Sequence, residues 1–188
     1  MADDDPRTDQ QLVEAANRGE EAAFAALYYR YRDWVVRLAL RFTGSQADAL
    51  DVLQETFAYL LGKLPDLRLT ARMTTFLYPV VKHLSLALLQ KKRRHVAGDE
   101  LLYAQPAPEP DRTEESRAEL AEACSALPGH HLEVVLLRFV DSMSLQEIAD
   151  ALDIPLGTVK SRLHHALNTL RESQKTRRYF GRDEEDSQ

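Results

Sequence analysis

Residues 144–166, SLQEIADALDIPLGTVKSRLHHA, decide how the second half of the chain folds. Ser144, followed three residues later by Glu147, forms a capping box, which is typical of a helix start. We expect a short helix over 145–152, a tight turn, and a second helix over about 156–173. A short helix, a turn and a polar, basic helix together predict a helix-turn-helix whose second helix enters the DNA major groove.

The two faces of this predicted helix pair differ in chemistry. Apolar side chains at helical spacing would pack the two helices together: Ile148, Ala149, Leu152, Ile154, Val159 and Leu163. Polar side chains at the start of the second helix would then face the groove: Thr158, Lys160, Ser161, Arg162, His164 and His165. The alternative interpretation is an ordinary packed pair of helices with a solvated polar face.

Composition indicates a helical protein of one or two domains. Of the 188 residues 44% are apolar, and 7 Gly and 8 Pro are too few for a turn-rich β protein. The sequence lacks an apolar run near the roughly 20 residues that span a bilayer, and its first residues are acidic where a secretory signal is basic. We therefore expect a cytoplasmic protein without membrane insertion. The single cysteine, Cys124, excludes a disulfide framework, and a packing role is favoured over a nucleophilic one.

Positive charge is concentrated in two blocks, although the formal net charge is −6. Residues 61–98 carry eight bases and one acid, a net +7, and residues 155–182 carry seven bases and one acid, a net +6. Between them, residues 99–127 carry eight acids and two bases, a net −6. Because bases that neutralise phosphates release counterions from DNA, each block predicts a nucleic-acid interface. Solvated helix faces are the alternative.

The chain is expected to form two small helical domains. Pro106, Pro108 and Pro110 alternate with small and acidic residues, which predicts an extended segment between the domains. The predicted fold is all-α, with two small helical domains joined by a flexible linker and a helix-turn-helix in the second. The predicted boundaries are 1–95 for the first domain, 96–115 for the linker, 116–175 for the second domain and 176–188 for an acidic tail.

Periodicity also predicts the helices of the first domain, at 10–17, 21–42, 46–61 and 74–94. Pro79 predicts either a kink in the last of these or a later start. The third helix carries an apolar set: Leu50, Leu53, Phe57, Leu60, Leu61 and Leu64. Another face of this helix carries Asp48, Asp51 and Glu55, which form either a solvated surface or a docking face.

Three motifs in this order resemble a known family. DALDVLQETF at 48–57, TFLYPVVKHL at 75–84 with the basic run after it, and the stretch 144–166 resemble extracytoplasmic-function sigma factors of bacterial RNA polymerase. The resemblance covers about residues 10–173. It implies a non-enzymatic subunit, without cofactor or metal, that binds core polymerase through its clamp helices and flap and directs promoter recognition, melting and transcription initiation. Promoter DNA and an anti-sigma factor or other inhibitor are the further implied partners.

The resemblance also implies roles for individual residues. The clamp would be bound by an acidic helix: Asp48, Asp51, Gln54 and Glu55. A loop from Lys63 to Thr74, with Phe76 and His83, would form one pocket for a flipped minus-ten base, and a basic track would hold the strand. The implied minus-ten residues are Lys63, Phe76, Lys82, His83, Lys91, Lys92, Arg93 and Arg94. The implied minus-thirty-five residues are Arg138, Thr158, Lys160, Ser161, Arg162, His164 and His165.

The sequence departs from the family pattern at several positions. Leu50 stands where an acid is usual, which weakens the docking face, and His83 and Phe76 stand where Asn and Trp are usual. Ala87 replaces a common Asp, and the pair His164-His165 replaces a more basic pair. These departures leave the class unchanged and make the promoter sequence hard to infer.

Two other classes compete with this interpretation. A free-standing helix-turn-helix regulator would bind duplex DNA without polymerase, whereas a sigma factor needs the core enzyme. An enzyme would rely on His130, His131 and Cys124, or on His164 and His165. Adjacent histidines on a helix point about 100° apart and do not easily share one metal, so the enzyme class is disfavoured.

Overall fold

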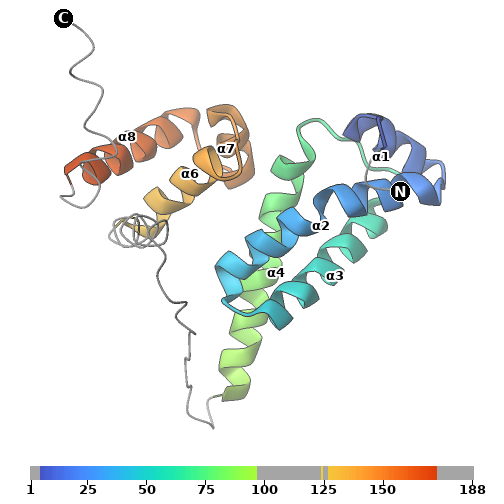
Figure 1. Cartoon of the computed structure of the whole chain (residues 1–188), viewed down its shortest axis with the longest axis horizontal. Coiled ribbons are helices and arrows are strands. Elements are labelled where there is room, and N and C mark those ends of the chain that lie inside the picture. The colour runs from blue at the N-terminus through green and yellow to red at the C-terminus, as the bar shows by residue number, and fades with distance from the viewer. Residues whose placement is uncertain (1–4, 97–123, 125–126, 173–188) are drawn as a thin grey trace, which may run out of the picture. The chain divides into compact units, whose positions relative to one another are not determined.

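The computed structural model describes residues 5–96, 124 and 127–172, and every regular element in these ranges is a helix (Figure 1). The chain divides into two compact units, Met1–Leu102 and Tyr103–Gln188. The helices of unit 1 are α1 (Asp9–Asn17), α2 (Glu21–Thr43), α3 (Gln46–Lys63) and α4 (Met73–Val96). The helices of unit 2 are α6 (Gly129–Phe139), α7 (Leu145–Leu152) and α8 (Leu156–Glu172).

The predicted all-α fold with two helical groups is confirmed. The predicted linker beyond Val96 and the predicted acidic tail, 176–188, lie outside the described residues. None of the helices in the described ranges has the length and hydropathy that crossing a membrane requires.

Local sequence sets the ends of the first helices. Thr8 and Gln11 form a capping box at the start of α1, because each side chain accepts a hydrogen bond from the other residue's backbone N–H. Helix α2 ends at Gly44, whose φ of +67° is a left-handed conformation that glycine adopts without strain. Ser45 follows at once and caps α3 by accepting from the N–H of Asp48. The breaks between these helices are therefore encoded within a few residues of each junction.

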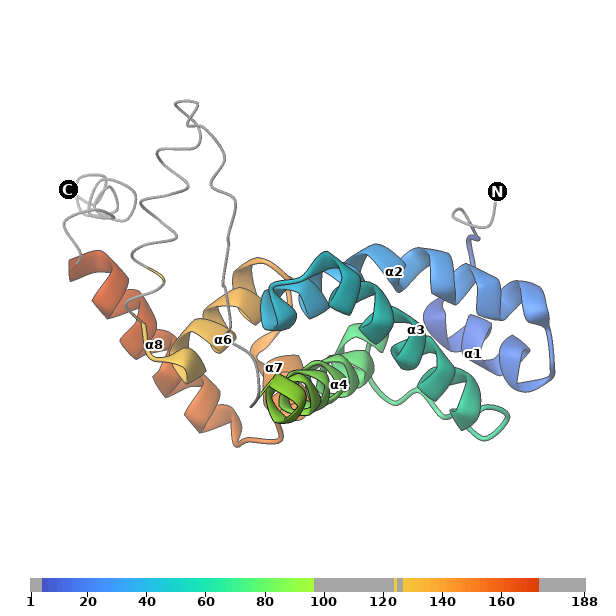
Figure 2. The ribbon, with the colours of Figure 1, turned by 90° about the horizontal axis from the view of Figure 1, so that it is seen from below.

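The four helices of unit 1 pack side by side around one apolar core (Figures 1 and 2). Its large buried side chains include Leu12, Leu27, Val35, Leu38, Phe57, Leu60, Leu77 and Tyr78. Two members of the apolar set of α3 lie on the surface instead, because Leu50 and Leu61 are 44% and 55% exposed. They are on the side of α3 that faces away from α2 and α4, so Leu50 lies at the rim of an exposed face.

Helix α4 is continuous through Pro79. It runs from Met73 to Val96, so the predicted alternative of a start later than residue 74 is wrong. Proline has no N–H and cannot make the usual hydrogen bond to the carbonyl oxygen of Thr75, one turn earlier. Pro79 itself is exposed, so its ring lies on the surface of unit 1 and the core side of the helix is undisturbed.

Helix α7 has the bounds that the sequence predicted. The Ser144 Oγ accepts from the N–H of Glu147 at 3.2 Å, and Glu147 Oε2 accepts from the N–H of Ser144 at 2.7 Å. Asp153, with φ +53°, ends the helix in the left-handed conformation, and α8 begins at Leu156. The helix-turn-helix is therefore present, with its capping box formed as expected.

Three of the six side chains predicted for the core of unit 2 are only half-buried: Leu152, Ile154 and Leu163. Ile148 and Val159 are fully buried. Leu163 was expected in the core but is only half-buried, at the edge of the cluster Leu127, Val135, Ala166 and Leu170. Cys124 packs against the same cluster, and burial raises the pKa of its thiol. A raised pKa keeps the thiol protonated, in agreement with a packing role.

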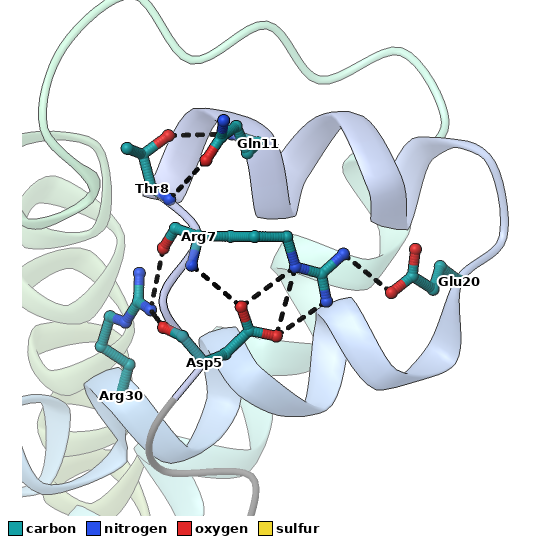
Figure 3. A network of polar contacts seen from close by, with 6 residues as sticks. All are labelled: Asp5, Arg7, Thr8, Gln11, Glu20 and Arg30. Carbon is teal, nitrogen blue, oxygen red and sulfur yellow. Dashed lines mark hydrogen bonds and ion pairs between the residues drawn. The ribbon is translucent and has the colours of Figure 1, made fainter.

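A polar network holds the residues before α1 against α2 (Figure 3). Arg7 donates to both carboxylate oxygens of Asp5 and, at 2.8 Å, to Glu20 Oε1. Arg30 of α2 donates to the carbonyl oxygens of Asp5 and Arg7, at 2.7 and 3.0 Å. The hydrogen bonds from Arg7 lower the pKa of Asp5 to about 2. The network fixes the start of α1, which forms one wall of a hollow described below.

Candidate nucleic-acid interfaces

An aromatic hollow of about 410 Å³ lies between α3 and α4, lined by Tyr59, Phe76, Pro79, Val80, His83 and Leu84. The ring centroids of Tyr59 and Phe76 are 6.4 Å apart. The Nζ of Lys63 lies 5.0 Å from the centre of the Tyr59 ring. The structure thus brings together three residues predicted for the minus-ten site, Lys63, Phe76 and His83. Stacking faces, an imidazole edge and a nearby cation are groups that bind unpaired bases.

Sequence reasoning missed Tyr59, the residue that connects these groups. Tyr59 is 41% exposed, at the edge of the buried stripe of α3, and was not assigned to any site. No local signal distinguished it, because a single exposed aromatic side chain is normal on a protein surface. Its contact with Phe76 depends on how α3 packs against α4.

The loop before α4 lines a different hollow. This loop hollow, of about 420 Å³, lies between the loop and α1 and is lined by Gln10, Val13, Glu14, Asn17, Leu67, Arg68, Leu69 and Thr70. Asn17 Nδ2 donates to the carbonyl oxygen of Leu67 at 2.8 Å and so fastens the loop to α1. Residues 67–70 of the predicted pocket loop therefore line a hollow with α1, whereas Phe76 and His83 line the aromatic hollow.

The predicted basic track does not present all of its side chains in the same way. Lys91, Arg93 and Arg94 are exposed at the end of α4. Lys92 is directed to α3, where its Nζ lies 2.5 Å from Asp48 Oδ1. Lys82 is half-buried and takes part in another interaction within unit 1. The exposed positive charge of the track is thus concentrated in the last two turns of α4.

The predicted acidic face also loses one member. Asp51, Gln54 and Glu55 are exposed on α3, but Asp48 is only 5% exposed and is paired with Lys92. The expectation that Asp48 shares an exposed stripe with Asp51 and Glu55 is therefore wrong. The reason is its place along the helix axis, because the end of α4 covers the first turn of α3 but not the next ones.

The recognition helix α8 presents most of its predicted DNA-facing side chains to solvent. Lys160, Ser161, His164 and His165 are exposed, whereas Thr158 and Arg162 are half-buried beside the face that packs on α6 and α7. Arg138 of α6 is exposed, and its guanidinium donates to the carbonyl oxygen of Met143 at 2.9 Å. Arg138 therefore also braces the turn between α6 and α7.

A contact between histidines of α6 and α8 was not predicted. The rings of His131 and His165 are stacked, with centroids 6.1 Å apart and planes 15° apart, and the ring of His130 is 4.4 Å from that of His131. Burial lowers the pKa of His131, and the positive charges of His130, His165 and Arg162 lower it further. Within the described ranges, the rings do not join other potential ligands in a group of three that would hold a metal.

Comparison with protein families finds two matches. Residues 27–95 match Sigma-70 region 2, and residues 123–172 match Sigma-70, region 4. The first match spans most of α2 and all of α3 and most of α4, including the aromatic hollow. The second spans α6, α7 and α8.

Similar curated proteins cover nearly the whole chain. The ECF RNA polymerase sigma-E factor of Escherichia coli (strain K12) is 31% identical over 177 residues, which is 87% of this chain and 92% of that protein. The ECF RNA polymerase sigma factor SigW of Bacillus subtilis (strain 168) is 28% identical over 176 residues, 86% of this chain and 94% of that protein.

Two solved structures share the fold. CnrH, solved in complex with the cytosolic domain of CnrY, has a TM-score of 0.63 at 21% identity, over 86% of this chain and 93% of that one. The sigma factor RpoE of Bartonella quintana, solved with the anti-sigma factor NepR, has a TM-score of 0.57 at 19% identity, over 75% of this chain and 89% of that one.

Proposed function

The chain belongs to the extracytoplasmic-function sigma factors of RNA polymerase, and we propose how its two units divide the work of promoter recognition. Unit 1 binds core polymerase through Asp51, Gln54 and Glu55 of α3 and captures the minus-ten element. Unit 2 binds the minus-thirty-five element as duplex through α8. The protein is a non-enzymatic specificity subunit that directs transcription initiation. It acts in the cytoplasm, with an anti-sigma factor or another inhibitor as its regulator.

The single observation that carries the minus-ten assignment is the aromatic hollow. Promoter opening leaves bases unpaired, and an unpaired base is held by stacking and by contacts to its edge. The hollow offers the Tyr59 and Phe76 rings for stacking and His83 for the edge, on the helix whose end is strongly basic. Lys91, Arg93 and Arg94 are placed to neutralise the phosphates of the same strand.

The minus-thirty-five assignment rests on the exposed side chains of α8. A recognition helix reads base edges in the major groove with polar groups and holds the backbone with cations. Lys160, Ser161, His164 and His165 provide both kinds of group on the side of α8 opposite its buried face. Capping and the left-handed turn at Asp153 fix the angle at which α8 leaves α7.

Dependence on core polymerase tests this function directly. Reconstituted holoenzyme is first used to select, by transcription in vitro, a promoter from a randomised duplex library. This selected promoter is the probe for binding. We expect holoenzyme to bind a forked version of this promoter at concentrations at which the chain alone leaves it unbound. If the free chain bound the selected promoter duplex as tightly as holoenzyme does, the protein would be a free-standing regulator and the proposal would be overturned.

Substituting His83→Asn is expected to change which base is preferred in the minus-ten element. A neutral imidazole offers one donor and one acceptor on opposite sides of a ring, whereas asparagine offers both on one planar amide. One hydrogen bond is worth about 1 kcal/mol, so we expect about a fivefold change in relative affinity for at least one base. The measurement is holoenzyme binding to four forked probes that differ at one unpaired position.

The matched control for this change is Tyr59→Leu. It removes a stacking surface that every base uses, so it should weaken binding to all four probes by about 1–3 kcal/mol without altering their order. An unchanged order of the four bases in His83→Asn would exclude His83 from the base-reading site.

A further inference from the structure

Asp48 is a buried carboxylate in the first turn of α3 with a partner on α4. Its backbone N–H donates to Ser45 Oγ, and its side chain accepts from Lys92 Nζ, 44 residues away in sequence. The Asp48 side chain is 7% exposed and that of Lys92 is 53% exposed. A carboxylate loses favourable hydration when it is buried, so the ion pair and the positive end of the helix must compensate for that loss.

The ion pair holds a part of α4 that the apolar core does not reach. Residues 90–94 are all exposed, and the nearest buried side chain before them on α4 is Ser85. At 100° per residue, Lys91 and Arg93 project about 100° to either side of Lys92, and Arg94 about 160° away. When Lys92 is directed to α3, its three basic neighbours are therefore directed away from α3.

We propose that Asp48 and Lys92 are a positioning pair that orients the basic end of α4, so that Lys91, Arg93 and Arg94 meet the promoter strand. This inference rests on the proposed contact between the basic track and DNA. It gives Lys92 a role through its neighbours instead of a phosphate contact of its own. It also gives Asp48 a role in DNA binding, although Asp48 lies on the helix that docks on the polymerase.

The sign of the effect of Asp48→Asn separates positioning from direct contact. This near-isosteric change removes one negative charge and releases Lys92, so simple electrostatics predicts equal or tighter DNA binding. Positioning predicts the reverse, a several-fold weaker binding of holoenzyme to the forked selected promoter, because the end of α4 is no longer held. The matched control is Asp33→Asn, which removes an exposed carboxylate from α2 and should not weaken binding.

Lys92 variants complete the test as a double-mutant cycle. Lys92→Met should weaken DNA binding in the otherwise unchanged chain and add little in the Asp48→Asn background. Lys92→Arg keeps the positive charge and is long enough to reach Asp48, so its holoenzyme should bind DNA as tightly as that of the unchanged chain. Amide hydrogen exchange in the free chain should be faster in the last turn of α4 for Asp48→Asn and Lys92→Met, and unchanged in α2.

Three results would overturn the proposal, and they differ from one another. If Asp48→Asn leaves DNA binding equal or tighter while Lys92→Met weakens it, Lys92 contacts DNA directly. If exchange also rises throughout α2, the pair supports the stability of the unit as a whole. If Lys91→Met and Arg93→Met leave binding unchanged, the basic track itself is wrong and the pair has nothing to position.

Discussion

Asp51→Lys is expected to lower the affinity for core polymerase by about 30-fold or more, equivalent to about 2 kcal/mol, while unit 1 stays folded. Asp51 is exposed on α3, next to Gln54 and Glu55, and takes no part in the core of the unit. In the proposed docking of α3, reversal replaces an attraction to a basic surface of the polymerase with a repulsion. Binding of labelled chain to purified core enzyme at fixed ionic strength measures the loss, and circular dichroism checks the fold.

Leu50→Glu is the matched change of opposite sign. Leu50 is 44% exposed beside Asp51, so a glutamate there should be tolerated and should tighten core binding by about 0.5–1 kcal/mol, as for one exposed charge pair. Both changes should be weaker in high salt because exposed charges are screened. Core affinity that is unaffected by Asp51→Lys would remove α3 as the docking helix.

Ile148→Ala is expected to destabilise unit 2 by about 2–5 kcal/mol, whereas Lys160→Ala should leave its stability unchanged. Ile148 is fully buried between the helices of the helix-turn-helix, and Lys160 is exposed on α8. Lys160→Ala should instead reduce transcription from the selected promoter. Because the chain divides into two compact units, amide hydrogen exchange in α7 and α8 of the full chain reports the stability of unit 2 separately from that of unit 1.

Leu163→Ala provides a substitution of intermediate expected effect for comparison with Ile148→Ala and Lys160→Ala. Leu163 is half-buried at the edge of the cluster, so its truncation leaves a site that solvent can enter and should destabilise unit 2 less than Ile148→Ala. If Lys160→Ala raised the exchange rates in α8 as much as Ile148→Ala, the orientation of the recognition helix described here would be wrong.

The sequence by itself determined the elements whose signals are local. The spacing of Ser144 and Glu147 predicted the capping box at the start of α7, and both of its hydrogen bonds are present. The predicted bounds of that helix are the observed ones. The predicted end of α2 near residue 42 and start of α3 at residue 46 are close to the observed ones, where Gly44 and Ser45 supply the caps. Such signals act between residues at most four apart, so they operate before any tertiary contact forms. The order of three longer motifs, at 48–57, 75–84 and 144–166, also predicted the family.

Part of the candidate site was predictable from the family resemblance. The resemblance implied roles for Phe76, His83 and Lys63, and the structure places all three beside one hollow. Tyr59 was not assigned to the site, because its place there depends on a contact with the ring of Phe76, which lies on another helix. The loop hollow was missed as a separate feature because α1, which forms its other wall, is about 50 residues earlier in the chain.

Only the tertiary structure decided which charges and apolar groups are exposed. Helical periodicity placed Asp48 with Asp51 and Glu55, and it placed Leu50 with the core leucines, because it records angle around one axis and nothing about neighbouring helices. The end of α4 covers Asp48 and supplies Lys92 from 44 residues away, while no helix covers Leu50 or Leu61 within the described part of unit 1. Burial depends on what packs against each turn of a helix, and that is a property of the folded unit.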